Sequence, residues 1–285
     1  MNEIKPLVRG IYDLQDIRIR IGNRIVSHFM SKLGVEPGKK KSKDVDALWK
    51  ELKQSHKRIT DALLEQPKVR KKFVTDGLIH NEIEYILVTI YLDLIEKEKQ
   101  LVKALDKHLK DHPVYQWLQE QKGVGPLMAG VILSEIKIHK AKYVSSLWKY
   151  AGLDVVNGKA RSARREHLVE REYIDKNGEK KTKLSLSFNK FLHDKLLGVL
   201  GTNLLRAKSE WATVYYNYRN RIENHPKHKD KSKGHIHNMS RRYMVKQFMK
   251  PLYAVWRQAE GLKVHPPYEE AKLGIKHHEE KVQPK

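Results

Sequence analysis

The sequence predicts a mainly α-helical fold. It begins with an arm or bundle of long helices, continues with two helices joined by a glycine-rich turn and followed by a β-hairpin, and ends in further helices. Apolar residues recur every three or four positions over most of the chain, which is the period of an amphipathic helix. The period is lost over residues 154–187, where residues alternate on both sides of Asn177-Gly178, a pair that favours a tight β-turn.

The first part of the chain, residues 1–111, contains three long apolar stripes. They cover residues 4–25, 45–63 and 83–105. A loop at 34–44 separates the first two, and Asp44 is placed to cap the second helix. Long helices with short connections predict an antiparallel bundle or a coiled-coil-like arm, which is compatible with a homodimer.

A second domain is predicted over residues 112–262. A short helix precedes the glycine-rich turn, and the segment "SSLWKYAGL" predicts another short helix that ends at Gly152. The last helix is expected from about His235 to Glu260, with Met244, Phe248, Leu252 and Val255 facing the core. Residues 263–285 are rich in charge and punctuated by proline, so we expect an extended or disordered tail.

The charge balance points to a polyanionic partner. Lys and Arg number 57 against 34 Asp and Glu, which gives a formal net charge of +23. Such an excess attracts nucleic acid, the commonest intracellular polyanion, although it can also serve only to keep a surface solvated. The chain has no cysteine, which excludes disulfides and thiolate metal sites. Without a long apolar run or a secretion signal, we expect a cytoplasmic protein with no membrane partner.

The glycine-rich turn is the most specific candidate site. Gly123-Val124-Gly125-Pro126 lies between two helical runs, in a pattern similar to the helix-hairpin-helix motif. Glycine allows a close approach of backbones, and the first turn of the next helix exposes unpaired N–H groups to an anion. Backbone groups of Gly123, Val124, Gly125 and Leu127 are therefore predicted to contact DNA phosphates without reading sequence, and Lys122 adds a cation.

Two basic segments extend this prediction. The stretch "KARSARR" contributes Lys159, Arg161, Arg164 and Arg165 as phosphate contacts. The hairpin that follows is narrow enough for a major groove, although a solvated hairpin with cross-strand ion pairs is the alternative. On the last helix, the basic residues lie on neighbouring turns, so this face is either solvated or in contact with DNA; they are Arg241, Arg242 and Lys246.

Two stretches, "QKGVGPLMAGVILSEI" and "SLWKYAGLDVVNG", resemble the C-terminal domain of a family of insertion-sequence transposases. In that family a helix-hairpin-helix is followed by a "YAGL" element. The segment around 234–262 also resembles the C-terminal helix of transposase-like proteins. The resemblance implies binding of duplex or branched DNA by a protein of mobile-element origin. The family's N-terminal RuvC-like domain, with four acidic metal ligands, has no counterpart here, because the first 111 residues have a helical pattern.

Three other readings of the sequence remain open. The resemblance implies a catalytic serine soon after "GL", and the nearest is Ser162, so an active transposase or recombinase is one alternative, and only then is Mg²⁺ expected as a cofactor. An RNA-binding or scaffolding protein is another, with Tyr215, Tyr216 and Tyr218 stacking on bases. His225, His228, His235 and His237 are close enough in sequence for zinc, but their irregular spacing and the absence of cysteine favour no metal site.

Overall fold

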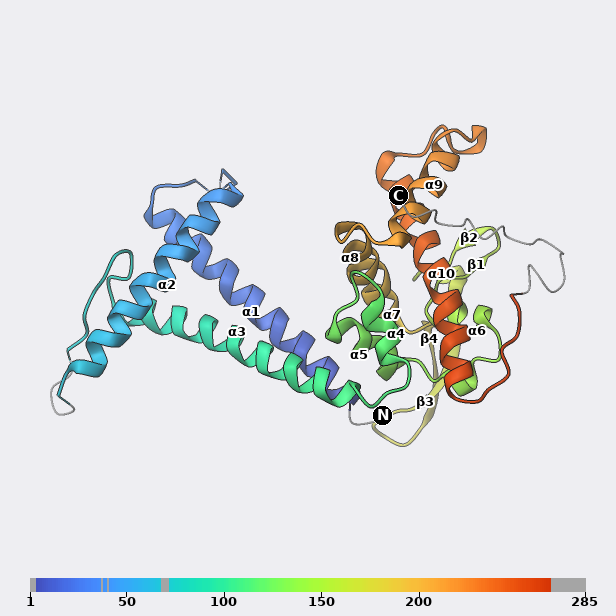
Figure 1. Ribbon diagram of the computed structural model, residues 1–285, viewed down its shortest axis with the longest axis horizontal. Helices are drawn as coiled ribbons and strands as arrows, with labels where there is room; N and C mark the ends of the chain where they lie inside the picture. The colour runs from blue at the N-terminus through green and yellow to red at the C-terminus, as the bar shows by residue number, and fades with distance from the viewer. Residues whose placement is uncertain (1–3, 37, 40, 68–71, 268–285) are drawn as a thin grey trace. The chain divides into compact units, whose positions relative to one another are not determined.

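The computed structural model describes residues 4–36, 38–39, 41–67 and 72–267, and its fold is mainly helical, as predicted (Figure 1). The described chain divides into two compact units, one within residues 6–104 and the other formed by residues 4–5 together with residues 105–267. The division after Ala104 falls inside a helix, somewhat before the predicted boundary at residue 111.

The unit Pro6–Ala104 is built from the three predicted long helices. They are α1 (Ile4–Lys32), α2 (Ser42–Glu65) and α3 (Glu82–Leu109). α1 and α3 are antiparallel, since Arg18 pairs with Glu98 at 2.7 Å and Lys32 with Glu84 at 2.8 Å. The apolar faces meet in one core, whose buried residues are Ile25, Val26, Phe29, Met30, Leu48, Leu52, Ile59, Ile79 and Val88.

The start of α2 differs in detail from the prediction. The residue at the N-cap is Lys41, and Asp44 lies three positions later, in the first turn. The carboxylate of Asp44 accepts a hydrogen bond from the backbone N–H of Lys41 at 3.1 Å. Asp44 therefore fixes the helix start from inside the helix, where its charge also favours the helix dipole.

The other unit packs short helices around one long helix. Along the chain these are α4 (Tyr115–Glu120), α5 (Pro126–Glu135), η1 (Ile138–Lys140), α6 (Val144–Tyr150), η2 (Arg165–His167), α7 (Lys190–Asp194), η3 (Lys195–Leu200), α8 (Gly201–Arg206), α9 (Glu210–Glu223), η4 (Pro226–His228) and α10 (Lys233–Ala259). α10 packs against α6, α8 and α9, and its predicted core residues Met244, Phe248 and Leu252 are fully buried. Residues 190–206 form a continuous helical run with a π-helical middle, η3.

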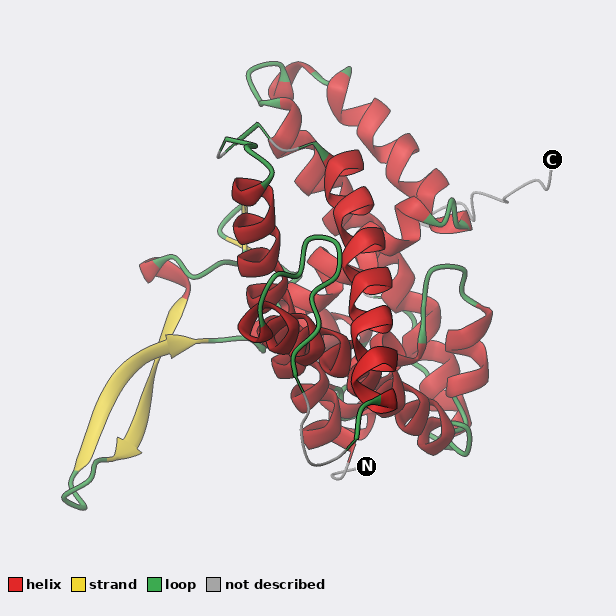
Figure 2. Cartoon of the chain, turned by 90° about the vertical axis from the view of Figure 1, so that its left-hand side faces the viewer, coloured by secondary structure: helices red, strands yellow, loops and turns green. Residues whose placement is uncertain are grey.

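Two β-hairpins follow α6. β1 (Val155–Val156) pairs with β2 (Lys159–Ala160), and β3 (Leu168–Ile174) pairs with β4 (Lys180–Leu186), both antiparallel. The predicted hairpin around Asn177-Gly178 is confirmed as β3–β4, and Figure 2 shows it as a ribbon that extends away from the helices. The sequence analysis missed β1–β2, whose two-residue turn places Asn157 at φ 49° and Gly158 at φ 74°.

The chain after α10 runs back along that helix. Residues 262–267 have no regular secondary structure, and Arg257 Nε donates to the carbonyl of Lys263 at 2.7 Å. The rest of the predicted tail, 268–285, lies outside the described residues. Within the described ranges, no helical segment combines the length and apolar character that crossing a bilayer requires.

Candidate nucleic-acid interface

The turn between α4 and α5 has the predicted glycine geometry. Val124 N–H donates to the carbonyl of Gln121 at 2.9 Å, which closes a tight turn directly after α4. Gly123 adopts φ 101°, in the left-handed region that favours glycine. Gly125 is the N-cap of α5 and Pro126 is the first helical residue, where its missing N–H costs no hydrogen bond.

Gly123 is required by packing within the protein. A Cβ at this position would lie 2.9 Å from the carbonyl oxygen of Asn203 and 3.2 Å from the Cα of Leu204. The turn therefore rests directly on the backbone of α8. The glycine pattern predicted a close approach to a ligand, whereas the backbone that Gly123 approaches in the structure belongs to α8 of the same chain.

Gly125 is not required by packing. Its φ of −97° is open to every residue type. A Cβ on Gly125 would meet no atom within 4 Å. Neither the backbone angle nor the neighbouring atoms require glycine at this position. Because no atom fills the space beside Gly125, an external group has room to reach the backbone there.

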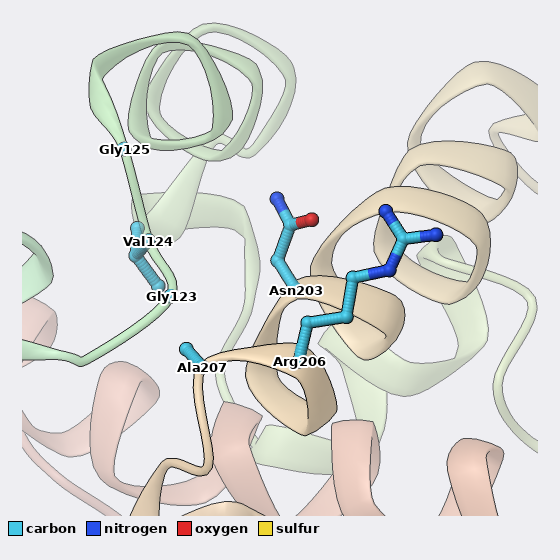
Figure 3. Close-up of a pocket in the computed structure, with 6 residues that line it drawn as sticks. All are labelled: Gly123, Val124, Gly125, Asn203, Arg206 and Ala207. Atoms are coloured by element: carbon cyan, nitrogen blue, oxygen red, sulfur yellow. The ribbon is translucent and has the colours of Figure 1, made fainter. Parts of the chain in front are cut away.

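An open depression of about 470 Å³ lies between the turn and α8 (Figure 3). Its lining residues are Gly123, Val124, Gly125, Asn203, Arg206 and Ala207. Asn203 and Arg206 lie three residues apart on α8 and hence on the same side of that helix. In Figure 3 the Asn203 side chain lies between the turn and Arg206, and the Arg206 guanidinium extends to the side away from the turn.

The electrostatics of this depression favour an anion. The first amides of α5, at Leu127 and Met128, precede the first possible intrahelical bond, and glycine at the N-cap has no side chain to accept from them. The dipole of α5 adds partial positive charge at this end. Arg206 and Lys122 are exposed, and within the described part of the chain no carboxylate pairs with either. The groups present thus suit an anion such as a phosphate.

Arg161 has an internal role instead of the predicted phosphate contact. Its guanidinium donates two hydrogen bonds to the carboxylate of Asp154, both at 2.7 Å, and one to Ser187 Oγ at 2.5 Å. The hydrogen bonds that Arg161 donates to Asp154 raise the pKa of Arg161 above its ordinary value. With its side chain only 10 % exposed, Arg161 ties the β1–β2 hairpin to the base of β3–β4.

The three basic residues predicted on α10 are partly buried. Arg242 donates to the carbonyls of Gly152 at 2.5 Å and Asp154 at 3.1 Å, and burial lowers its pKa. Arg241 donates to Asn238 at 2.9 Å and covers Gly201 at the start of α8. Lys246 lies with its ammonium 4.3 Å from the ring centre of Trp148. Arg242 therefore holds the chain after α6, and the other two also take part in packing.

The remaining basic residues of "KARSARR" are exposed. Lys159 pairs with Glu166 at 3.3 Å, and Arg164 lies 4.0 Å from the same carboxylate. Arg165 begins η2 and forms no ion pair with the described residues. One carboxylate facing two exposed cations leaves this segment with positive charge at the surface, as predicted.

Ser162 lies beside a buried histidine. Its backbone N–H donates to His167 Nδ1 at 3.1 Å, and its Oγ is 3.4 Å from the same nitrogen. The nitrogen's one lone pair is thus engaged by the backbone, and 3.4 Å is long for a bond from a hydroxyl. The backbone contact fixes the loop around Ser162, and catalysis by Ser162 stays a prediction.

The tyrosines and histidines of the alternative readings are dispersed. Tyr215 is buried, with its hydroxyl 2.6 Å from His237 Nδ1, and Tyr218 is stacked on Tyr243 at 4.0 Å. Only Tyr216 is largely exposed, at 60 %, so the three tyrosines do not form one row for bases. Among the described residues no three metal-ligating side chains gather, and the rings of His225 and His228 lie 5.3 Å apart by ring centre.

Asn203 and Arg206 line the candidate site without having been predicted from the sequence. Both come from α8, and Arg206 is a basic residue in the last turn of that helix. Nothing in the sequence connects position 206 with position 125, because their proximity depends on how α8 packs beneath the turn. Comparison of the chain with protein-family models, with curated proteins and with solved structures gives no match.

Proposed function

We propose that this protein binds duplex or branched DNA through its phosphates, with the depression between the α4–α5 turn and α8 as the central contact. Three features of the depression together carry the proposal. The N-terminus of α5 has no side-chain cap, position 125 is glycine although neither packing nor backbone angle requires it, and the exposed Arg206 lines the same depression. A phosphate supplies the charge and acceptors that these groups lack.

Two further features support DNA as the ligand. The chain carries a formal net charge of +23, and phosphate contacts dominate the affinity of proteins for nucleic acid. The exposed residues Lys122, Lys159, Arg164 and Arg165, together with the β3–β4 hairpin, extend the positive surface beyond the depression. The resemblance of the turn and the "YAGL" element to insertion-sequence transposases suggests that the protein derives from a mobile element.

Substitution of Gly125 tests the central contact. Gly125→Asp and Gly125→Asn place side chains of equal size in open space, and both are good N-cap residues. We expect both variants to fold, and only Asp to repel a phosphate. Fluorescence anisotropy with a labelled duplex should show a loss of affinity for Gly125→Asp on the order of tenfold or more relative to Gly125→Asn.

Arg206→Gln tests the second side of the depression. Removing one phosphate contact should lower the slope of log K against log salt by about 0.9. Lys103→Gln is the matched control, because it removes one exposed charge from α3 in the other unit. Equal slopes for Arg206→Gln and wild type would show that Arg206 does not contact a DNA phosphate. Stronger binding to a duplex RNA than to the same DNA sequence would favour the RNA-binding alternative.

A further inference from the structure

The β3–β4 hairpin separates its charges by face. In the antiparallel register, Val169 faces Ser185, Arg171 faces Lys183 and Tyr173 faces Lys181, so these six residues share one face of the ribbon. The opposite face carries both acidic residues of β3, Glu170 and Glu172. One face of the ribbon is therefore basic, and the acidic residues that would neutralise it lie on the other.

The pairing of Arg171 with Lys183 destabilises the isolated hairpin. Like charges directly opposite each other on neighbouring strands repel, whereas opposite charges would stabilise the pairing. Both residues are exposed, and neither forms an ion pair with any described residue. One ion pair of the kind considered from the sequence joins the two arms of the hairpin, between Asp175 and Lys181 beside the turn, and among the described residues none neutralises Arg171 or Lys183.

At the turn end of the ribbon, the basic residue of this face has acidic partners. Lys181 pairs with Asp175 and with Glu179, the latter at 3.1 Å, so its charge is neutralised beside the turn. The Lys183 ammonium lies 4.7 Å from the ring centre of Tyr173, which is 38 % exposed. The unneutralised charge is thus concentrated at Arg171 and Lys183, with an aromatic ring beside them.

We propose that the face carrying Arg171, Tyr173 and Lys183 is a second phosphate-binding surface, which lies against the backbone of duplex DNA while Glu170 and Glu172 point away. The proposal rests on the proposed function and adds an orientation to it. The repulsion between Arg171 and Lys183 is relieved when a phosphate lies between them, since each then gains an opposite charge. The ribbon extends away from the helices, so this face is open to a duplex (Figure 2).

A pair of double variants tests the orientation. Arg171→Gln/Lys183→Gln removes two charges from the basic face, and Lys176→Gln/Lys180→Gln removes two from the turn and the opposite face. Anisotropy with a labelled duplex across a salt series should show a slope smaller by about 1.8 for the first variant, and the wild-type slope for the second. Circular dichroism and thermal unfolding confirm that both variants are folded.

Other outcomes separate the two proposals. Equal slopes for Arg171→Gln/Lys183→Gln and wild type, with binding still lost in Gly125→Asp, would overturn the hairpin surface alone. The same reduction in both double variants would show that total charge matters and that neither face is preferred, which also overturns it. Absence of duplex binding by the wild-type protein at low salt would overturn the proposed function and this inference together.

Discussion

Gly123 and Gly125 lie two positions apart in one turn, yet they have different roles. Gly123 needs its left-handed backbone angle and its missing Cβ in order to rest on α8. Gly125 needs neither, and the space beside it is where a phosphate is proposed to bind. One glycine therefore maintains the fold, and the other keeps the site open.

This difference predicts opposite effects on stability. Gly123→Ala should lower the free energy of unfolding by on the order of 1–3 kcal/mol, because alanine is strained at this φ and its Cβ meets Asn203. Gly125→Ser should leave stability within about 0.5 kcal/mol of wild type or raise it, since serine is a good N-cap. Urea denaturation of the two variants beside wild type measures both; equal losses would contradict the assignment.

At the scale of elements, one buried carboxylate joins α1 to α3. The Glu84 side chain, on α3, accepts from Lys32 of α1 at 2.8 Å and from the backbone N–H of His80 at 2.7 Å, and lies 2.8 Å from His28 Nε2. Burial alone would raise the pKa of Glu84, but these bonds outweigh it and lower the pKa to about 2. The contact thus stabilises the antiparallel pairing of the two helices only while Glu84 is ionised.

The lowered pKa predicts a pH dependence for this unit. Because the folded-state pKa lies below the ordinary value of 4.5, the contribution of Glu84 is complete above about pH 4.5 and is lost as pH falls towards 2. At neutral pH it is on the order of 3 kcal/mol. Urea denaturation should show wild type more stable than Glu84→Gln at about pH 7, with the difference shrinking by about pH 3. A difference that is constant with pH would contradict this role.

At the scale of the whole molecule, local patterns in the sequence predict most of the fold. The stripe through Met244, Phe248 and Leu252 predicts α10, and Asn177-Gly178 predicts the β3–β4 turn, because both signals depend only on neighbouring residues. The β1–β2 hairpin has the same Asn-Gly signal at its turn, Asn157-Gly158, but its strands of two residues carry no detectable alternation on either side of it.

The candidate site is less predictable because it depends on contacts between distant residues. The turn at 123–125 is visible in the sequence, whereas Arg206 joins it only through the packing of α8. Arg161 shows the opposite case, a residue that the sequence places at the candidate site and that the fold uses internally. It has the sequence context of a surface cation, but the fold places Asp154 and Ser187 against its guanidinium. Charge counts therefore locate the basic segments without showing which cations remain available.

The formal charge of +23 belongs to the molecule as a whole, and its predicted consequence is measured by salt. Fluorescence anisotropy of a labelled DNA duplex against the wild-type protein, repeated across a salt series, tests the central claim most directly. Binding should weaken as salt rises, with log K falling linearly with log salt by about 0.9 for each phosphate neutralised. No binding at low salt, or an affinity that does not change with salt, would contradict the claim that this protein grips DNA by its phosphates.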